Sequence, residues 1–242
     1  MVYTRTSKEM RTNPFFLRNQ FQVIGRWGIP VIKRQNIDIS NARLISCADT
    51  RFNDRPENKL CGVHFFVDDY RFENIYRNPD KTLPKFSQYA FLLSPDFSTY
   101  ADMHPWRQLE SIAHSRWCGA YWQSKGLKVI PTISWSTPSS YSYCFDGVEI
   151  GSVVAVGIIG CRKNKVAFLR GYREMLKVIQ PEAIICFGKP FFEMEGNVVS
   201  VDYLSSRKVV VSNALCKFFF TFLEEINHIT ISRSSGRMRS PN

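Results

Sequence analysis

The chain has 242 residues, of which 44% are hydrophobic and 14% aromatic, so it can build a full core and global disorder is excluded. Lys and Arg outnumber Asp and Glu by 32 to 21, and the net charge of +11 indicates a polyanionic partner such as nucleic acid. No stretch approaches 18 apolar residues and the N-terminus has no apolar signal core, so we expect neither secretion nor a membrane partner.

The two ends of the chain differ in composition from its middle. Residues 1–14 are polar and Thr-rich and predict a flexible arm, and residues 15–60 mix short apolar pieces with polar turns, which predicts a small strand-rich segment. Residues 232–242 are basic and Ser-rich and predict a disordered tail. We therefore expect a single α/β domain over 15–231, with its core at 62–203.

Six short apolar runs follow one another along this core. Each is bounded by Gly, Pro or Asp and lacks polar alternation, which is typical of parallel strands that are buried on both faces. The runs are Val63–Val67, Tyr89–Leu93, Val129–Ile133, Val153–Ile159, Ala183–Phe187 and Val198–Val201.

Three helical stretches accompany the runs. His104–Lys125 follows Asp102, which we expect to be its N-cap, and Val166–Gln180 carries apolar residues at helical spacing. Asn213–Asn227 likewise places its Leu, Phe and Ile side chains on one face. Alternating strands and helices predict right-handed βαβ units and hence an α/β fold.

Two links between the predicted strands are unsuited to full helices. Residues 136–152 and 189–197 are too short or too rich in Ser and Gly. The sequence therefore predicts a mostly parallel, irregular βα sheet or a partial barrel, with the small strand-rich segment at its N-terminal side.

The seven cysteines and four histidines show none of the usual metal-binding spacings. The cysteine count is odd and no Cys-x-x-Cys pair occurs, so we predict neither structural disulfides nor zinc, and a reducing, cytoplasmic setting. Cysteines in apolar runs, including Cys161 and Cys186, are expected to behave as small buried hydrophobes. P-loop and Rossmann fingerprints are absent, and we expect no cofactor.

Acidic side chains follow directly after several predicted strands. Ligands bind at the carboxyl ends of strands in parallel α/β sheets and barrels, so Asp68 and Asp96 are candidate catalytic residues. They could work as an acid/base pair or hold a divalent cation through oxygen ligands. Asp69 and Asp202 have similar positions, and the hydroxyl-rich loop 134–142 could line a pocket. The alternatives are that these aspartates merely cap helices and that the loop is plain surface.

Basic side chains near two predicted helices are candidates for binding nucleic acid or another anion. One group precedes the helix at 166–180, beside the positive end of its dipole, and continues with outward-facing cations on that helix. The other group shares the helix at 104–125 with aromatic residues. The alternatives are a solvated basic turn and an ordinary aromatic core stripe. The candidates are Arg107, Arg116, Arg162, Lys163, Lys165, Arg170 and Arg173.

Eight motifs along the core belong to a familiar pattern, and they lie at 62–73, 93–98, 106–110, 129–136, 144–147, 171–175, 181–188 and 195–197. Through these motifs, and over about residues 14–203, the chain resembles an uncharacterised domain-of-unknown-function family, number 4417, carried by phages, prophages, plasmids and bacterial chromosomes. The resemblance implies a role tied to mobile elements in a bacterial cytoplasm, and it transfers no catalytic residue.

Three hypotheses for the function remain at this point. The first is a phage or mobile-element protein that binds nucleic acid or a nucleoprotein complex through its basic surface. The second is an enzyme that acts on a nucleotide-like or phosphorylated substrate at the strand-end carboxylates. The third is a protein-binding inhibitor of a host defence system, whose partner is a host or phage protein.

Overall fold

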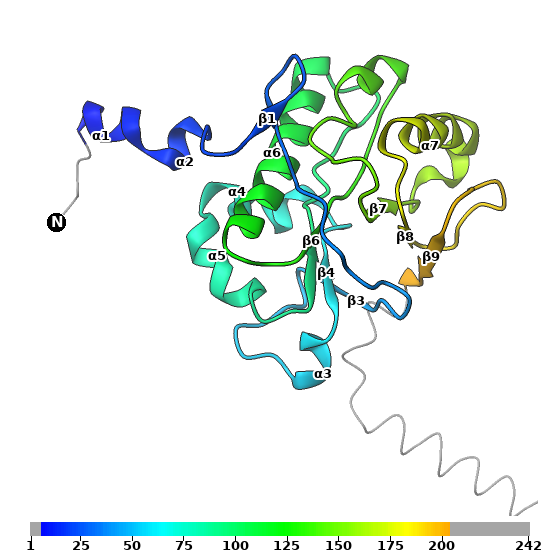
Figure 1. The fold of residues 1–242 in the computed structure, drawn as a ribbon, viewed down its shortest axis with the longest axis horizontal. Coiled ribbons are helices and arrows are strands. Elements are labelled where there is room, and N and C mark those ends of the chain that lie inside the picture. Colours follow the sequence, from blue (N-terminus) through cyan, green and yellow to red (C-terminus); the bar gives the residue numbers. More distant parts are fainter. Residues whose placement is uncertain (1–5, 204–242) are drawn as a thin grey trace, which may run out of the picture. The chain divides into compact units, whose positions relative to one another are not determined.

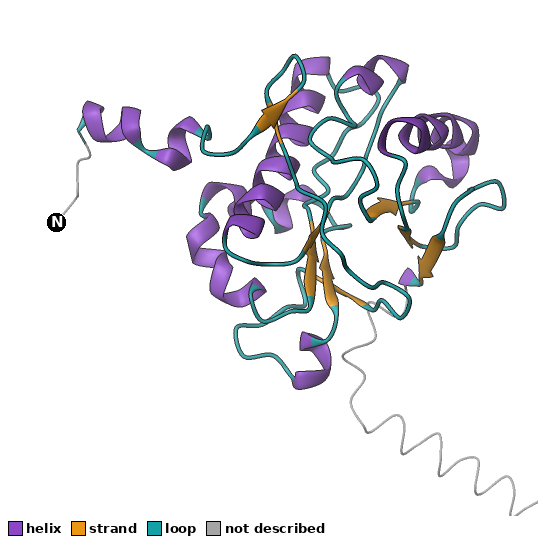
Figure 2. Ribbon diagram, in the orientation of Figure 1, coloured by secondary structure: helices purple, strands orange, loops and turns teal. Residues whose placement is uncertain are grey.

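The computed structural model describes residues 6–203, and its helices and parallel strands confirm the α/β prediction (Figures 1 and 2). Two sets of strands form parallel sheets. The first is β3 (Leu44–Ser46), β4 (Gly62–His64), β5 (Phe91–Leu93) and β6 (Val129–Ile130), paired in that order. The second is β7 (Val154–Gly157), β8 (Ile184–Phe187) and β9 (Val198–Val201), also in chain order.

A parallel bridge joins the two sheets just beyond β6. Thr132 pairs with Ala155 of β7. The Ile133 amide donates to the Ala155 carbonyl at 2.8 Å, and the Ala155 amide donates to the Pro131 carbonyl at 2.9 Å. The seven parallel strands therefore form one series in which spatial order equals chain order. This order is typical of βα barrels, in which each strand is followed by a crossover to its neighbour.

The series of strands is strongly curved. In a flat sheet β4 and β8 would lie roughly 19 Å apart, at about 4.8 Å per strand. Instead the His64 ring of β4 is 4.4 Å from the Phe187 ring of β8. Apolar side chains from six of the strands also share one buried cluster on the concave side. They are Leu44, Leu93, Ile130, Ala155, Ile185 and Val201. The predicted partial barrel is confirmed.

All six predicted runs overlap a strand, although five of the strands are shorter than the runs. The strand β3 belongs to the same sheet as β4, β5 and β6, although the sequence predicted residues 15–60 to be an N-terminal strand-rich segment outside the core at 62–203. Leu44 and Ile45 of β3 are both buried, and they pack into different clusters on the two faces of the sheet. The one antiparallel pair described, β1 (Val23–Ile24) with β2 (Ile29–Pro30), is the part of that segment that stays outside the parallel series.

Helices lie on the outside of the strands (Figure 2). The helix α6 (Pro105–Ser124) starts after His104 rather than Asp102, because Pro105 occupies the first helical position. Trp106, in the first turn of this helix, is 66% exposed, whereas every residue from 115 to 122 is buried. The middle of α6 is therefore covered on all sides, so its polar side chains are buried along with the apolar ones.

The helix α7 (Lys165–Ile179) matches the prediction and ends at Gln180, whose left-handed backbone (φ 47°) precedes Pro181. The link 136–152 contains only the 3₁₀ turn η2 (Pro138–Ser142), and no helix is assigned in 189–197, as predicted. The expected helix at 213–227 and the tail at 232–242 lie outside the described residues.

Three helices between β3 and β5 were not predicted. They are short, and Pro84 lies inside the longest of them, so their apolar pattern is weak. They nevertheless bury Ile75 and Phe86 against the outer face of the sheet. These helices are α3 (Pro56–Lys59), α4 (Glu73–Arg77) and α5 (Pro79–Phe86).

One helix occurs within the predicted flexible arm, and a second begins at the last residue of that arm. The helix α1 (Ser7–Thr12) begins with a capping box in which Thr6 and Glu9 satisfy each other's backbone amides, and α2 (Pro14–Leu17) follows it. After α2, the Arg18 guanidinium lies 3.9 Å from the Trp117 ring centroid on α6. Within residues 6–203, none of the helices has both the length and the apolarity needed to cross a membrane.

Candidate functional site

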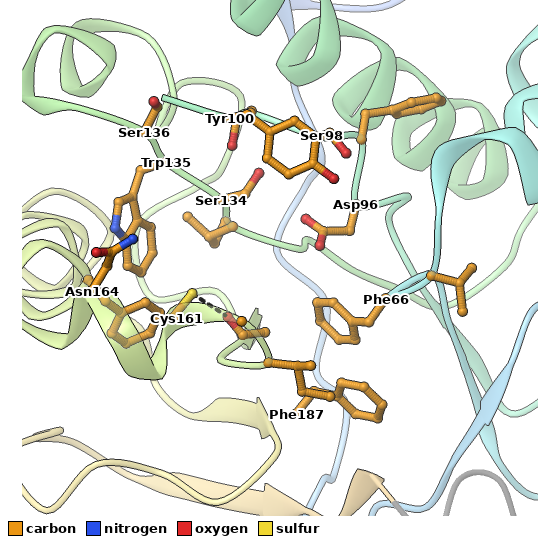
Figure 3. A pocket seen from close by; sticks show the side chains of 18 of the residues that line it. Phe66, Asp96, Ser98, Tyr100, Ser134, Trp135, Ser136, Cys161, Asn164 and Phe187 are labelled. Atoms are coloured by element: carbon orange, nitrogen blue, oxygen red, sulfur yellow. Dashed lines mark hydrogen bonds between the residues drawn. The ribbon is translucent and has the colours of Figure 1, made fainter. Parts of the chain in front are cut away.

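A pocket of about 800 Å³ opens at the carboxyl ends of the parallel strands (Figure 3). Every strand of the curved series contributes to its lining, which is the arrangement expected for ligand sites in βα barrels. One lining residue from the end of each strand, from β3 to β9, is Asp49, Asp68, Asp96, Ser134, Cys161, Phe187 and Tyr203.

Asp96 is half-buried in this pocket, and its side chain points into the same space as Phe66 and Ser134 (Figure 3). Burial raises the pKa of the Asp96 carboxyl to about 7, and the negative charge of Asp69 acts in the same direction. The Ser134 hydroxyl and the Arg116 charge oppose this shift. Asp96 therefore exists in both protonation states near neutral pH.

The chain just before Asp96 is held rigidly. The Ser94 hydroxyl accepts a hydrogen bond from the Thr132 amide at 2.9 Å, and the Ser94 carbonyl accepts one from the Thr132 hydroxyl at 2.6 Å. A third contact, at 3.0 Å, joins the hydroxyls of Ser94 and Ser115 on α6. These buried bonds fix the end of β5 against β6 and α6, and so they fix the position of Asp96.

The two aspartates that follow β4 have different surroundings. The side chain of Asp68 is 71% exposed at the pocket edge and lies 3.9 Å from Arg71. Asp69, in the turn η1 (Asp69–Arg71), accepts hydrogen bonds from the Ser98 amide at 3.1 Å and the Ser98 hydroxyl at 2.9 Å. The structure thus brings Asp68 and Asp96 to one pocket, but the acid that acts on Asp96 is Asp69.

The last acidic candidate, Asp202, lies outside the pocket. Asp202 is exposed and is not part of the pocket lining. Within residues 6–203, no group of three or more His, Cys, Asp or Glu side chains is arranged to hold a metal ion.

Aromatic rings form two walls of the pocket. Phe66 and Phe187 are stacked with ring centroids 4.8 Å apart and planes 13° apart, and Trp135 lies 5.0 Å from Phe168. A Cβ atom at Gly171 of α7 would lie 2.2 Å from the Trp135 indole nitrogen, so only glycine lets the indole pack against the helix backbone. These walls suit a flat, aromatic ligand.

The hydroxyl-rich loop 134–142 lines the pocket with its first residues. Its position is set by Gln108 of α6, which is buried and donates a hydrogen bond to the Ser136 hydroxyl at 3.2 Å. The same Gln108 accepts a hydrogen bond from the Tyr143 hydroxyl at 2.9 Å. The loop is therefore an ordered wall of the pocket.

The cysteines differ in one respect from the prediction. Cys161 does not lie in a strand; it lies in the turn η3 (Cys161–Asn164) and lines the pocket, where burial and the Asp96 charge raise its pKa. The other five described cysteines are buried, and all six are free thiols. Burial raises the pKa of Cys186 to about 12, so it behaves as an inert core residue.

Four of the predicted basic residues are exposed on η3 and α7, two elements that contribute to the pocket lining. Arg162 and Lys163 are exposed on η3, and Arg170 and Arg173 are exposed on α7. Arg170 also lines the pocket. We call these four residues the basic strip.

The other three predicted basic residues have protein partners. Lys165 pairs with Glu193 at 2.6 Å, and Arg107 pairs with Glu110 on the same helix. Arg116 is fully buried and donates hydrogen bonds to three backbone carbonyls, so it does not face a ligand. Its acceptors are Thr132 at 2.8 Å, Cys144 at 3.0 Å and Asp146 at 3.0 Å.

The sequence reasoning missed the aromatic and imidazole lining of the pocket. Phe66, Phe187 and His64 were counted only as strand residues, because an apolar run does not reveal which side chains meet across a curved sheet. A sharper signal was available for His64, since it is a titratable residue inside an otherwise apolar run.

Comparison with known proteins places the chain in a family. A family model described as "Domain of unknown function (DUF4417)" matches residues 21–204. The "Gene 1 protein" of Mycobacterium phage L5 is 37% identical over 194 residues, which is 77% of this chain and 84% of that protein. The "Gene 1 protein" of Mycobacterium phage D29 is 38% identical over 159 residues, 63% of this chain and 59% of that protein. No solved structure matches the chain. The protein therefore belongs to the DUF4417 family, which includes phage proteins.

Proposed function

We propose that the pocket binds a nucleotide-like molecule and that Asp96 transfers a proton to or from it. The observation that carries this proposal is a half-buried carboxyl with a pKa near 7 in a strand-end pocket. A general acid or base works best when its pKa lies close to the working pH, and such shifted groups cluster at active sites. The bonds around Ser94 support the role, because they hold Asp96 in one position.

The shape and charge of the pocket support a ligand with a flat ring and an anionic group. A volume of about 800 Å³ lies within the usual range for small-molecule sites. The stacked pair Phe66 and Phe187 offers apolar ring faces, and Arg170 offers a guanidinium that can pair with phosphate. A nucleoside monophosphate combines both features.

A binding titration with nucleoside 5′-monophosphates tests this proposal. We expect at least one of them to bind the wild-type protein with a Kd below 1 mM in isothermal titration calorimetry. Arg170→Gln should weaken that binding about tenfold or more, because it removes the cation that lines the pocket.

Arg173→Gln is the matched control, since Arg173 is also exposed on α7 but does not line the pocket. It should leave the Kd within about twofold. Absence of binding by every nucleotide at millimolar concentration, or equal losses in the two variants, would contradict the proposal.

A second candidate function is nucleic-acid binding through the basic strip. The observation in its favour is that four cations on the consecutive elements η3 and α7 are all exposed. Binding through phosphates releases counterions, so log Kd should rise with log salt concentration with a slope of several units.

Fluorescence anisotropy with a labelled single-stranded oligonucleotide measures that slope. The double variant Arg162→Gln, Lys163→Gln should reduce it by about two, one unit for each lost phosphate contact. Arg107→Gln is the control, because Arg107 is already paired with Glu110. A protein that fails to bind at low salt, or whose binding is insensitive to salt, does not use this surface for nucleic acid.

A further inference from the structure

His64 lies at the buried end of the pocket. It is the last residue of β4, it is only 2% exposed, and it is part of the pocket lining. Its ring centroid is 4.4 Å from that of Phe187 and 5.8 Å from that of Phe66. No step of the proposed function uses this side chain.

Its hydrogen bonding identifies which ring nitrogen carries the proton. Nδ1 accepts a hydrogen bond from the Phe66 amide at 3.2 Å, so it presents a lone pair. Burial lowers the pKa of the imidazole to about 3, which makes the ring neutral at physiological pH. A neutral ring with an unprotonated Nδ1 carries its proton on Nε2. Nε2 is buried and has no hydrogen-bond partner among the described residues.

An unpaired buried donor is unfavourable, and an acceptor that reaches it gains a strong interaction. The rings packed on His64 are apolar, so a neutral acceptor is favoured there over an anion, which would lose its hydration. The charged group of a ligand is better placed beside Arg170, which lines the same pocket and is exposed.

We propose that His64 is a specificity residue, whose Nε2–H donates a hydrogen bond to a ring oxo group of the ligand. This inference rests on the proposed function and names the ligand class: an oxo-substituted aromatic ring that enters the pocket ahead of its phosphate. The partly exposed Phe66 ring is stacked on Phe187, and the proposal requires this ring to turn aside so that the ligand ring can lie beside His64.

The test compares two nucleotides that differ at the proposed acceptor. Inosine 5′-monophosphate carries an oxo group at carbon 6 of its ring, and purine riboside 5′-monophosphate has a hydrogen there. We expect wild-type protein to bind the first about tenfold more tightly in calorimetric titrations. His64→Leu should abolish this preference, and His64→Gln should restore part of it, because the glutamine amide can donate from a position near that of Nε2.

The possible outcomes are distinguishable. Equal affinity of wild-type protein for both nucleotides, or an undiminished preference in His64→Leu, overturns the inference and leaves the proposed function standing. Failure of both nucleotides to bind overturns this inference, and the proposed function fails with it only when the other nucleoside 5′-monophosphates also do not bind. A ¹⁵N NMR spectrum of histidine-labelled protein gives a readout that needs no ligand: a proton on Nδ1 of His64 instead of Nε2 also overturns the inference. Thermal melts of both variants verify that they fold.

Discussion

Arg116→Met is expected to lower the free energy of unfolding by about 3–5 kcal/mol, because three buried backbone carbonyls lose their shared donor. Those carbonyls belong to Thr132 and to two residues of the segment that follows η2, so the guanidinium ties the end of β6 to that segment. Methionine fills a similar volume but cannot donate. Each carbonyl that loses its donor is then an unsatisfied acceptor and costs about 1–3 kcal/mol of stability. Removal of the buried Arg116 charge partly offsets this loss.

Urea denaturation at pH 7 measures this loss. Burial lowers the pKa of Arg116 to about 10, so the side chain is charged at that pH and the charge-assisted bonds are present. Arg107→Met on the same helix is the control. Arg107 is partly exposed and paired only with Glu110, so its replacement should cost less than about 1 kcal/mol. Similar small losses in both variants would show that the buried network adds little to stability.

Asp96→Asn is expected to lower turnover of the bound nucleotide by about 10²–10⁴-fold, the usual contribution of a general acid or base. The same change should stabilise the protein at pH 8 by about 2–4 kcal/mol and have no effect at pH 4. The reason is that burial and the neighbouring Asp69 raise the pKa of Asp96 from 3.8 to about 7. A carboxyl whose pKa is raised in the folded state lowers the free energy of unfolding of the protein as pH rises from about 4 to 7. Asparagine cannot ionise, so the variant does not have this loss.

The measurement is the difference in unfolding free energy between wild type and variant at pH 4, 6 and 8. Burial lowers the pKa of His114 to about 4, which makes stability rise with pH in the same range, but this contribution cancels in the difference. Asp68→Asn is the control, because Asp68 is exposed and should change stability by less than about 0.5 kcal/mol at each pH. A loss of about 1 kcal/mol in Asp96→Asn with turnover retained would mean that Asp96 is only structural.

Local patterns in the sequence were sufficient to predict most of the strands and the edge of the sheet at which the pocket lies. Apolar runs of four to seven residues ended by Gly or Asp are a local pattern, and each of the six overlaps a parallel strand. Because the carboxyl ends of parallel strands share one edge, the position of Asp96 three residues after the end of such a run was enough to predict that it meets other strand ends there. The pocket lining supports that argument.

The tertiary structure alone decided which side chains act together. Asp68 and Asp69 are neighbours in the chain, yet Asp68 is exposed at the turn η1. Asp69 instead accepts a hydrogen bond from Ser98, which lies 29 residues further along the chain. Arg116 looked like a surface cation because the apolar stripe of its helix omits it, but α6 is covered on all sides at that point and the acceptors come from 16 to 30 residues further along. The spacing of apolar residues in a sequence shows only which face of a single helix or strand is apolar. The partners across a curved sheet are set by topology, which brings together residues that no local pattern relates.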